Sequence, residues 1–169
     1  MLVLNLVLLS IMVNASPVTE GKISVAGNGC YGDMQIRPVS GTEDRYELPI
    51  KVKLNKKAGS VFTRKTCNMR LSVSLKANEK LQVSDVSQAV QINGRDIKST
   101  LSISVVGNKT KPLVATKSQV IQADGILVES KCGRDAMLVG NLNVLAYGAV
   151  AVSATTEAVQ VTLKIIKCN

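Results

Sequence analysis

The chain has 169 residues, a length that favours a single domain and leaves no room for two full hydrophobic cores. Its 21 Lys and Arg residues outnumber its 12 Asp and Glu residues, which gives a formal charge of +9. It contains no histidine, which excludes Ser-His-Asp and Cys-His catalytic arrangements and argues against a zinc site.

The first fifteen residues have the pattern of a cleavable signal peptide. An apolar run ends in Val13-Asn14-Ala15, whose spacing of small residues predicts cleavage before Ser16. The run is shorter than the roughly 20 apolar residues that span a bilayer, and no second run of that length follows. We expect a signal peptide over 1–15 and a secreted or periplasmic domain over 16–169, without a transmembrane segment. The alternative for this stretch is a buried N-terminal strand or helix.

After this leader, apolar and polar residues alternate with a period of two, which predicts strands with one buried and one exposed face. The alternation is unbroken over 46–54 and 69–75. Between Leu81 and Ile92 the apolar positions change parity, which predicts a bulge or a bend. In chain order, the candidate strands are 22–26, 34–39, 46–54, 69–75, 81–92, 97–105, 126–129, 138–146 and 159–165.

Turn-forming residues separate these runs. Asn93-Gly94, between two candidate strands, predicts a type I′ hairpin, and Asp124-Gly125 predicts another turn. The alanine-rich stretch 146–158 resembles a helix, but its β-branched residues favour strands. Together these patterns predict an all-β fold, an antiparallel β-sandwich of about eight or nine strands with two disulfides.

An even number of cysteines behind a signal peptide predicts disulfides, and this chain has four, Cys30, Cys67, Cys132 and Cys168. If 136–146 and 157–167 form a hairpin, the last two cysteines lie opposite each other at its open end. That geometry favours pairing Cys132 with Cys168 and leaves Cys30 with Cys67, although four cysteines permit three connectivities. No pair has metal-ligand spacing, so we predict neither a metal site nor a cofactor.

Short motifs surround each cysteine: Gly27-Asn28-Gly29-Cys30, Arg64-Lys65-Thr66-Cys67, Lys131-Cys132-Gly133 and the near-terminal Cys168. Their order resembles that of the domain of unknown function 4360 family, small secreted proteins of fungi and bacteria, over nearly the whole mature chain. The aromatic residues of that family near the third and fourth cysteines are replaced here by Ser130-Lys131 and Ile166-Lys167. The resemblance implies secretion and a disulfide-bonded β fold, and it implies no activity.

Positive charge is concentrated in one segment that contains no acidic residue, between positions 51 and 70. Such a patch can attract an anionic cell-surface polymer or lipid headgroups. Nucleic acid is not expected, because the chain is predicted to be secreted and has only four aromatic residues for base stacking. A basic surface without a dedicated partner is the alternative interpretation. The candidate binding residues are Lys51, Lys53, Lys56, Lys57, Arg64, Lys65 and Arg70.

A glycosidase-type pair of carboxylates is the remaining catalytic possibility. Because nearly all candidate acids lie in turn-like stretches or on polar strand faces, we expect no enzymatic activity and assign no catalytic residue. The acids considered are Asp33, Glu43, Asp44, Glu47, Asp85, Asp124, Glu129 and Asp135.

The sequence thus predicts a secreted or periplasmic, non-enzymatic sandwich that binds an anionic polysaccharide or cell surface through its basic segment. The alternatives are a structural, fimbria-like assembly subunit and a carbohydrate-active enzyme on a sandwich scaffold. Asn108-Lys109-Thr110 is a glycosylation sequon in a predicted turn. The sequence predicts neither the ligand's identity nor the oligomeric state.

Overall fold

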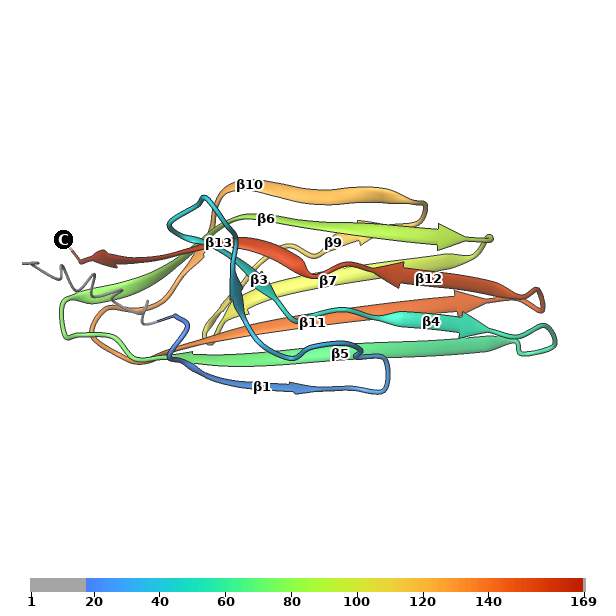
Figure 1. Ribbon diagram of the computed structural model, residues 1–169, viewed down its shortest axis with the longest axis horizontal. Helices are drawn as coiled ribbons and strands as arrows, with labels where there is room; N and C mark the ends of the chain where they lie inside the picture. The colour runs from blue at the N-terminus through green and yellow to red at the C-terminus, as the bar shows by residue number, and fades with distance from the viewer. Residues whose placement is uncertain (1–17, 169) are drawn as a thin grey trace, which may run out of the picture.

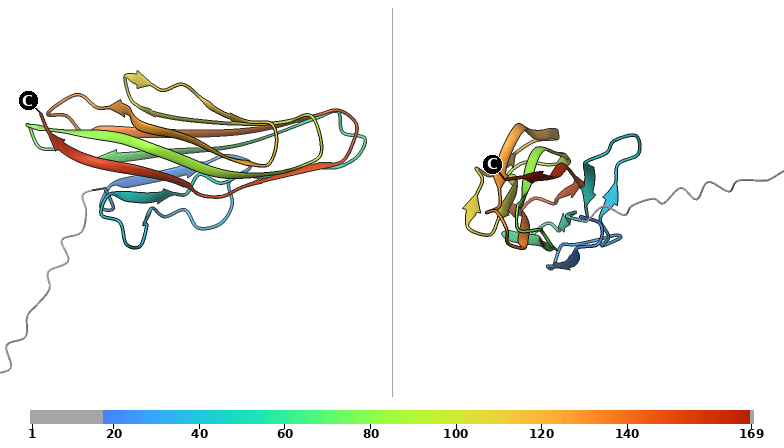
Figure 2. Two further views of the ribbon diagram at one scale, coloured as in Figure 1. Left: turned by 90° about the horizontal axis from the view of Figure 1, so that it is seen from above. Right: turned by 90° about the vertical axis from the view of Figure 1, so that its left-hand side faces the viewer.

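A computed structural model of the protein describes residues 18–168, and these residues form two antiparallel β-sheets packed face to face, with no helix among them (Figure 1). The predicted all-β sandwich is therefore confirmed. The strands run along the long axis of an elongated molecule (Figure 2). The predicted signal peptide over 1–15 lies outside the described residues.

The first sheet, sheet A, is built around two twelve-residue strands, β5 (Phe62–Val73) and β11 (Ala136–Tyr147), which pair along their whole length. The edge strand on one side is β1 (Lys22–Ala26), beside β5. On the other side β11 pairs with β7 (Ile97–Val105), which in turn pairs with two short strands, β8 (Asn108–Lys109) and β9 (Leu113–Ala115).

The second sheet, sheet B, is organised around the longest strand, β6 (Glu79–Asn93). One side of β6 pairs with β10 (Gln119–Glu129), and the other side pairs with two consecutive strands, β12 and β13. Beyond these lie β4 next to β12, β3 next to β13, and β2 next to β3. The remaining bounds are β2 (Arg37–Pro38), β3 (Arg45–Leu48), β4 (Lys53–Lys56), β12 (Val152–Thr156) and β13 (Val159–Lys167).

Sheet B is interrupted at one level in two neighbouring strands, between β3 and β4 and between β12 and β13. Pro49 has no N–H to offer a ladder, and the Ile50 N–H turns back to the Leu48 carbonyl. The buried Gln88 side chain fills the gap and donates to the carbonyls of Ile50 (3.1 Å) and Glu157 (2.9 Å). With each interrupted pair counted as one strand and the short strands β2, β8 and β9 left out, eight principal strands make up the sandwich, in agreement with the predicted eight or nine.

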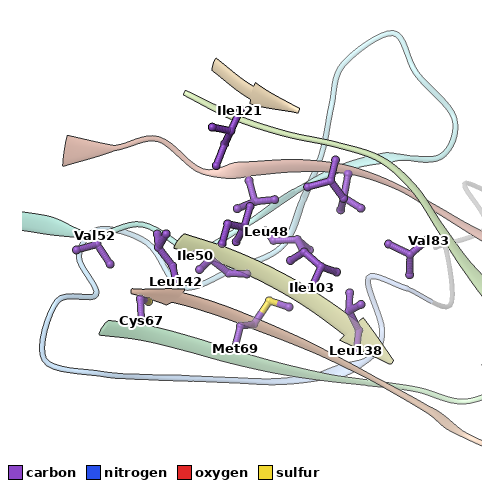
Figure 3. Close-up of a cluster of buried hydrophobic side chains, with 14 of the residues drawn as sticks. Leu48, Ile50, Val52, Cys67, Met69, Val83, Ile103, Ile121, Leu138 and Leu142 are labelled. Carbon is purple, nitrogen blue, oxygen red and sulfur yellow. The ribbon is translucent and has the colours of Figure 1, made fainter. Parts of the chain in front are cut away.

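The core lies between the sheets and is almost wholly aliphatic, as the composition requires (Figure 3). The alternation read from the sequence sets it: the side chains that point inward from 46–54 and from 69–73 are fully buried. Both segments contribute every second residue, because successive side chains of a strand point to opposite faces. They are Tyr46, Leu48, Ile50, Val52 and Leu54, with Met69, Leu71 and Val73.

The change of parity within 81–92 corresponds to a bulge in β6 at Asp85, which has a positive φ of 48°. The Asp85 carboxylate accepts the Gly125 N–H across the strand pair at 2.8 Å. Gly125 has a φ of 78° and lies in a bulge within β10, so the predicted turn at Asp124-Gly125 is wrong. An Asp-Gly pair can lie in a bulge within a strand or in a turn that reverses the chain, and the pair of residues alone does not distinguish the two.

The predicted hairpin at Asn93-Gly94 is also wrong, although a tight reversal does occur there. The strands on its two sides, β6 and β7, belong to different sheets and do not pair with each other. This turn carries the chain from sheet B to sheet A. Local turn chemistry specifies the reversal, whereas the choice between a hairpin and a crossing between sheets depends on packing.

Both predicted disulfides are present, Cys30–Cys67 and Cys132–Cys168. The hairpin from which the second pairing was argued does not exist, because β11 lies in sheet A and β13 in sheet B. Cys132 and Cys168 meet because they follow β10 and β13, the two neighbours of β6 in sheet B. The first bridge holds the 27–36 segment across the sandwich edge, where Gly29 bonds to Thr66 of sheet A and to Lys53 of sheet B.

Candidate binding face

The structure does not place the seven predicted basic residues on one surface. Lys56 is a correction to that set, because its side chain is only 2% exposed. Its parity with Leu54 turns it inward, and its ammonium donates to the Val150 carbonyl at 2.6 Å, which closes one end of the sandwich. Lys56 is therefore a structural residue and cannot meet a polymer.

Two further lysines of the set are half-buried. The ammonium of Lys51 lies 5.6 Å from the ring centroid of Tyr31, a cation–π geometry. Lys65 points inward from β5 and donates to the Asn28 carbonyl at 3.0 Å. Both side chains hold the 27–36 segment against the sandwich.

The four exposed members divide between the two sheets. Lys53 projects from the outer side of β4 in sheet B, and Lys57 lies in the turn that follows. Arg64 and Arg70 project from the outer side of β5 in sheet A. The basic residues are neighbours in the sequence but do not form one patch in the structure, because the chain crosses from sheet B to sheet A between Lys57 and Arg64.

The outer face of sheet A, called the sheet A face below, brings Arg64 and Arg70 together with residues from distant segments. Cross-strand partners point to the same side, so the strand registers define rows of neighbouring side chains on this face. From one end to the other the rows are Phe62 and Tyr147; Arg64, Leu145 and Lys98; Thr66, Asn143, Thr100 and Val114; Ala26, Asn68, Asn141 and Ser102; Ser24, Arg70, Val139, Ser104 and Lys109; and Lys22, Ser72 and Met137.

Charge is segregated onto this sheet. Its strands contain six basic residues, Lys22, Arg64, Lys65, Arg70, Lys98 and Lys109, and their described sequences contain no acid. All but Lys65 are exposed on the sheet A face. Sheet B, by contrast, mixes bases with acids such as Glu47, Glu79 and Glu129. No acid therefore lies between these bases on the strands themselves, and the acids near them border the face: Glu20 and Asp135 beside Lys22, Glu129 beside Lys109, and Asp96 beside Tyr147.

Between the bases, the face presents amides and hydroxyls. Asn68 of β5 lies opposite Asn141 of β11, and the Asn143 amide oxygen accepts the Arg64 Nε–H at 3.0 Å. That bond fixes the orientation of one guanidinium on a rigid strand. Asparagine side chains can both donate and accept hydrogen bonds, so the row suits a partner rich in hydroxyl and carboxylate groups.

Lys22, Lys98 and Lys109 were missed in the sequence, where they lie far from the basic segment. The alternation alone puts Lys98 on the exposed side of its strand, but which strands are neighbours does not follow from it. The absence of acids is no signal for this face, because β4, β12 and β13 of sheet B contain no acid either.

Five of the eight acids considered for catalysis, Asp33, Asp44, Asp85, Glu129 and Asp135, are engaged in local contacts. Asp33 pairs with Arg37, whose hydrogen bond lowers the pKa of that carboxyl. Bonds from Lys80 and Gln82 lower the pKa of Glu129, and the Gly125 N–H, followed by Ser84, lowers that of Asp85. Asp44 lies 3.6 Å from the Lys164 ammonium. The lowered pKa keeps the carboxylates of Asp33, Glu129 and Asp85 ionised, the opposite of what a general acid needs.

Pairs of acids line several hollows: Asp44 with Glu79, Asp33 with Glu47, and Glu20 with Asp135. A further hollow, on sheet B, has a volume of about 430 Å³ and is lined by two acids. It lies where the strands of sheet B are interrupted, and its lining includes Glu47, Glu157, Lys51 and Gln88. Glu43, Asp124 and Asp135 do not line it.

Within 18–168, no three His, Cys, Asp or Glu side chains gather in a way that could hold a metal ion. The same residues contain no helix long and apolar enough to cross a bilayer.

The sequon asparagine, Asn108, is exposed at the start of β8, and its amide nitrogen donates to the Glu129 carbonyl at 2.8 Å. Glycosylation at Asn108 stays a prediction.

No protein-family model matches the chain, and no curated protein matches it significantly. Among solved structures, it is similar to TmCBM61 in complex with β-1,4-galactotriose, with 10% identity, a TM-score of 0.38 and coverage of 86% of this chain and 88% of the other. A structure of infectious bursal disease virus Gx strain gives 9% identity, a TM-score of 0.40 and coverage of 87% and 32%. Likenesses this distant carry no functional argument.

Proposed function

We propose that the protein is a non-enzymatic binding module, and that the sheet A face binds an anionic polysaccharide at a cell surface. The observation that carries this proposal is the segregation of charge: five exposed bases and no acid on the strands of one sheet. The two disulfides support export to an oxidising compartment, where such polymers occur. We also propose that the chain belongs to the domain of unknown function 4360 family, whose members are small secreted proteins.

The dimensions of the face favour a linear polymer over a small anion. Arg64 and Arg70 are six residues apart on one strand, which corresponds to about 20 Å at roughly 3.4 Å per residue. Lys98 and Lys109 widen the charged area toward β7 and β8, and Lys22 widens it toward β1. A polymer with repeated carboxylates or sulfates can contact several of these bases at once, whereas a single anion would reach one or two.

Removing bases from this face should weaken polymer binding. In the quadruple variant Lys22→Ser, Arg64→Ser, Arg70→Ser and Lys98→Ser, we expect about a tenfold or greater loss of affinity for polygalacturonate in low salt. Four exposed ion pairs at roughly 0.5 kcal/mol each sum to about 2 kcal/mol, and a tenfold change corresponds to about 1.4 kcal/mol. Retention of the wild type should also fall as salt rises, because salt screens exposed charges. Binding to immobilised polygalacturonate, with uncharged dextran as a reference, measures both effects.

A matched variant separates position from net charge. Lys53→Ser, Lys57→Ser, Lys76→Ser and Lys117→Ser also removes four exposed lysines, all outside the strands of sheet A. We expect this control to bind nearly as well as the wild type. Equal losses in the two variants would show that overall charge governs retention and would remove the sheet A face as a site.

The other two sequence-based hypotheses receive less support. Assembly by edge-to-edge pairing would need an open, regular edge, yet the long edge strand β10 is interrupted by bulges, a feature that discourages such pairing. Stable polymers in size-exclusion chromatography would restore the structural-subunit hypothesis. An enzyme would act in the hollow with Glu47 and Glu157. The enzyme hypothesis would be established if the wild type hydrolyses a glycan and the Glu157→Gln variant does not.

A further inference from the structure

One end of the sandwich exposes apolar side chains, in contrast to the basic and polar side chains on the rest of the sheet A face. Four large ones are exposed there: Val61 (74%), Phe62 (50%), Tyr147 (49%) and Val150 (73%). We call these four residues the apolar tip. It lies at the opposite end of the molecule from the C-terminus, where β4 leads into β5 and β11 leads into β12 (Figure 1).

The tip is a built surface rather than two independent loops. The Gly59 N–H donates to the Ala149 carbonyl at 2.9 Å, which joins the 57–61 turn to the 148–151 turn. The rings of Phe62 and Tyr147 contact each other, with centroids 5.4 Å apart. Tyr147 also donates its N–H to Asp96 in the neighbouring turn, at 3.0 Å. Phe62 and Tyr147 are therefore held together at this end, and Val61 and Val150 lie in the two turns that the Gly59–Ala149 bond joins.

The placement of aromatic residues here is unusual for this chain. It has one Phe, three Tyr and no Trp, and aromatic side chains supply the largest apolar surface for a core. A fold so poor in aromatics nevertheless leaves Phe62 and Tyr147 half-exposed at one point. Contiguous exposed apolar side chains usually mark a surface that another molecule or a membrane covers.

The geometry points to an anionic lipid bilayer as the partner: we propose that the apolar tip inserts into the interfacial region of such a membrane. The next row of the sheet behind the rings contains Arg64 and Lys98, and Lys57 lies in the tip's own turn. Rows on one face of a strand are about 7 Å apart. When the rings sit roughly 5–10 Å deep, at the boundary between headgroups and acyl chains, these bases reach the anionic headgroups.

A glycan fits the tip less well. The two rings are inclined at 50° to each other, so they do not form the flat platform on which consecutive sugars stack. The other two residues of the tip, Val61 and Val150, offer no side-chain group that bonds a hydroxyl. Aromatic residues beside aliphatic ones and a basic row are instead typical of membrane-interface anchors.

A single fluorophore provides the test, because the chain contains no tryptophan. In Phe62→Trp, the emission should shift to shorter wavelength when vesicles of phosphatidylglycerol and phosphatidylcholine in equal amounts are added. Vesicles of phosphatidylcholine alone should produce little shift. Lipids brominated on the acyl chains should quench the emission, which distinguishes insertion from adsorption of the charged face to headgroups.

Binding variants complete the test without altering charge. Val61→Ser, Phe62→Ser and Val150→Ser together should reduce co-sedimentation with the anionic vesicles about tenfold or more, because most of the inserted apolar area is removed. The matched control is Val106→Ser, Val120→Ser and Ile126→Ser, whose side chains are similarly exposed, at 66%, 60% and 63%, but lie elsewhere. It should bind vesicles like the wild type.

Three results would overturn the proposal. The first is no emission shift with anionic vesicles. The second is the same shift with polygalacturonate, together with lost polygalacturonate retention in the tip variant, which would make the tip part of the glycan site. The third is a dimer that the tip variant dissociates, which would make a second copy the occupant. Because the tip variant keeps every base, it leaves the polysaccharide proposal to be judged separately.

Discussion

Replacing Cys30 and Cys67 together by alanine is expected to destabilise the protein by about 4 kcal/mol or more. The bridge closes a loop with a sequence separation of 37, for which the chain-entropy model gives roughly 4 kcal/mol. Cys67 is also fully buried in β5, so its replacement removes core contacts. Urea denaturation of the variant, compared with the wild type, measures the loss as a change in midpoint.

The second bridge supplies a matched control. Cys132–Cys168 has almost the same sequence separation, 36, but Cys132 is exposed and Cys168 only half-buried. Its double alanine variant should lose a similar entropic contribution without the core contribution. A Cys30/Cys67 variant that is no less stable than the Cys132/Cys168 variant would contradict the assignment of the first bridge to the core.

Gly140→Ala should also destabilise the fold, by about 1–3 kcal/mol, because the core is already filled at that point. Gly140 lies in the middle of β11 and is buried. A Cβ added there would lie 2.1 Å from the Cδ1 atom of Ile50, which reaches across from sheet B. The alanine therefore forces Ile50 to move or the sheets to separate, and thermal or urea unfolding detects the loss.

The contact can be tested by removing the opposing atom. Ile50→Val deletes Cδ1 and alone should cost about 0.5–1.5 kcal/mol. In the double variant the new methyl group occupies the space left by Cδ1, so we expect it to be more stable than the sum of the single changes predicts. Strict additivity would show that Gly140 is required for another reason.

The alternation of side chains specified most of the fold in advance. Tyr46 to Leu54 and Met69 to Val73 point into the core as expected, since a one-residue shift would expose the whole apolar set. What alternation cannot give is the partner of each strand. The reversal at Asn93-Gly94 was identified, yet its two strands went to different sheets because packing, rather than the turn, decides that choice.

The binding face was harder to predict for the same reason. The residues from Lys51 to Arg70 form one basic segment in the sequence, but the chain passes from sheet B to sheet A within it. Of the seven bases, only Arg64 and Arg70 lie exposed on the sheet A face. The prediction that Lys56 is exposed was wrong because the alternation of 46–54 continues to position 56. Lys56 shares the parity of Leu54, so its side chain is buried. Lys22, Lys98 and Lys109 join the face through strand neighbours that the sequence does not reveal.

The apolar tip went unnoticed because apolar residues at the start of a strand resemble the core residues that follow. Phe62 has the parity of Arg64 and points outward with it, but one aromatic residue in an alternating run carries no sign of exposure. Its contact with Tyr147 depends on the β5–β11 register, in which these two residues are paired at the very end of the ladder.

The most direct measurement is a map of the backbone amides that respond when isotope-labelled mature protein is titrated with polygalacturonate oligosaccharides. We predict that shifts in the NMR spectrum concentrate on β1, β5, β11 and β7, with the largest around Arg64, Arg70 and Asn141, and that they fade as salt is raised. Shifts confined to β4 and the strands around it in sheet B, or spread evenly over all exposed lysines, would contradict a dedicated site on sheet A.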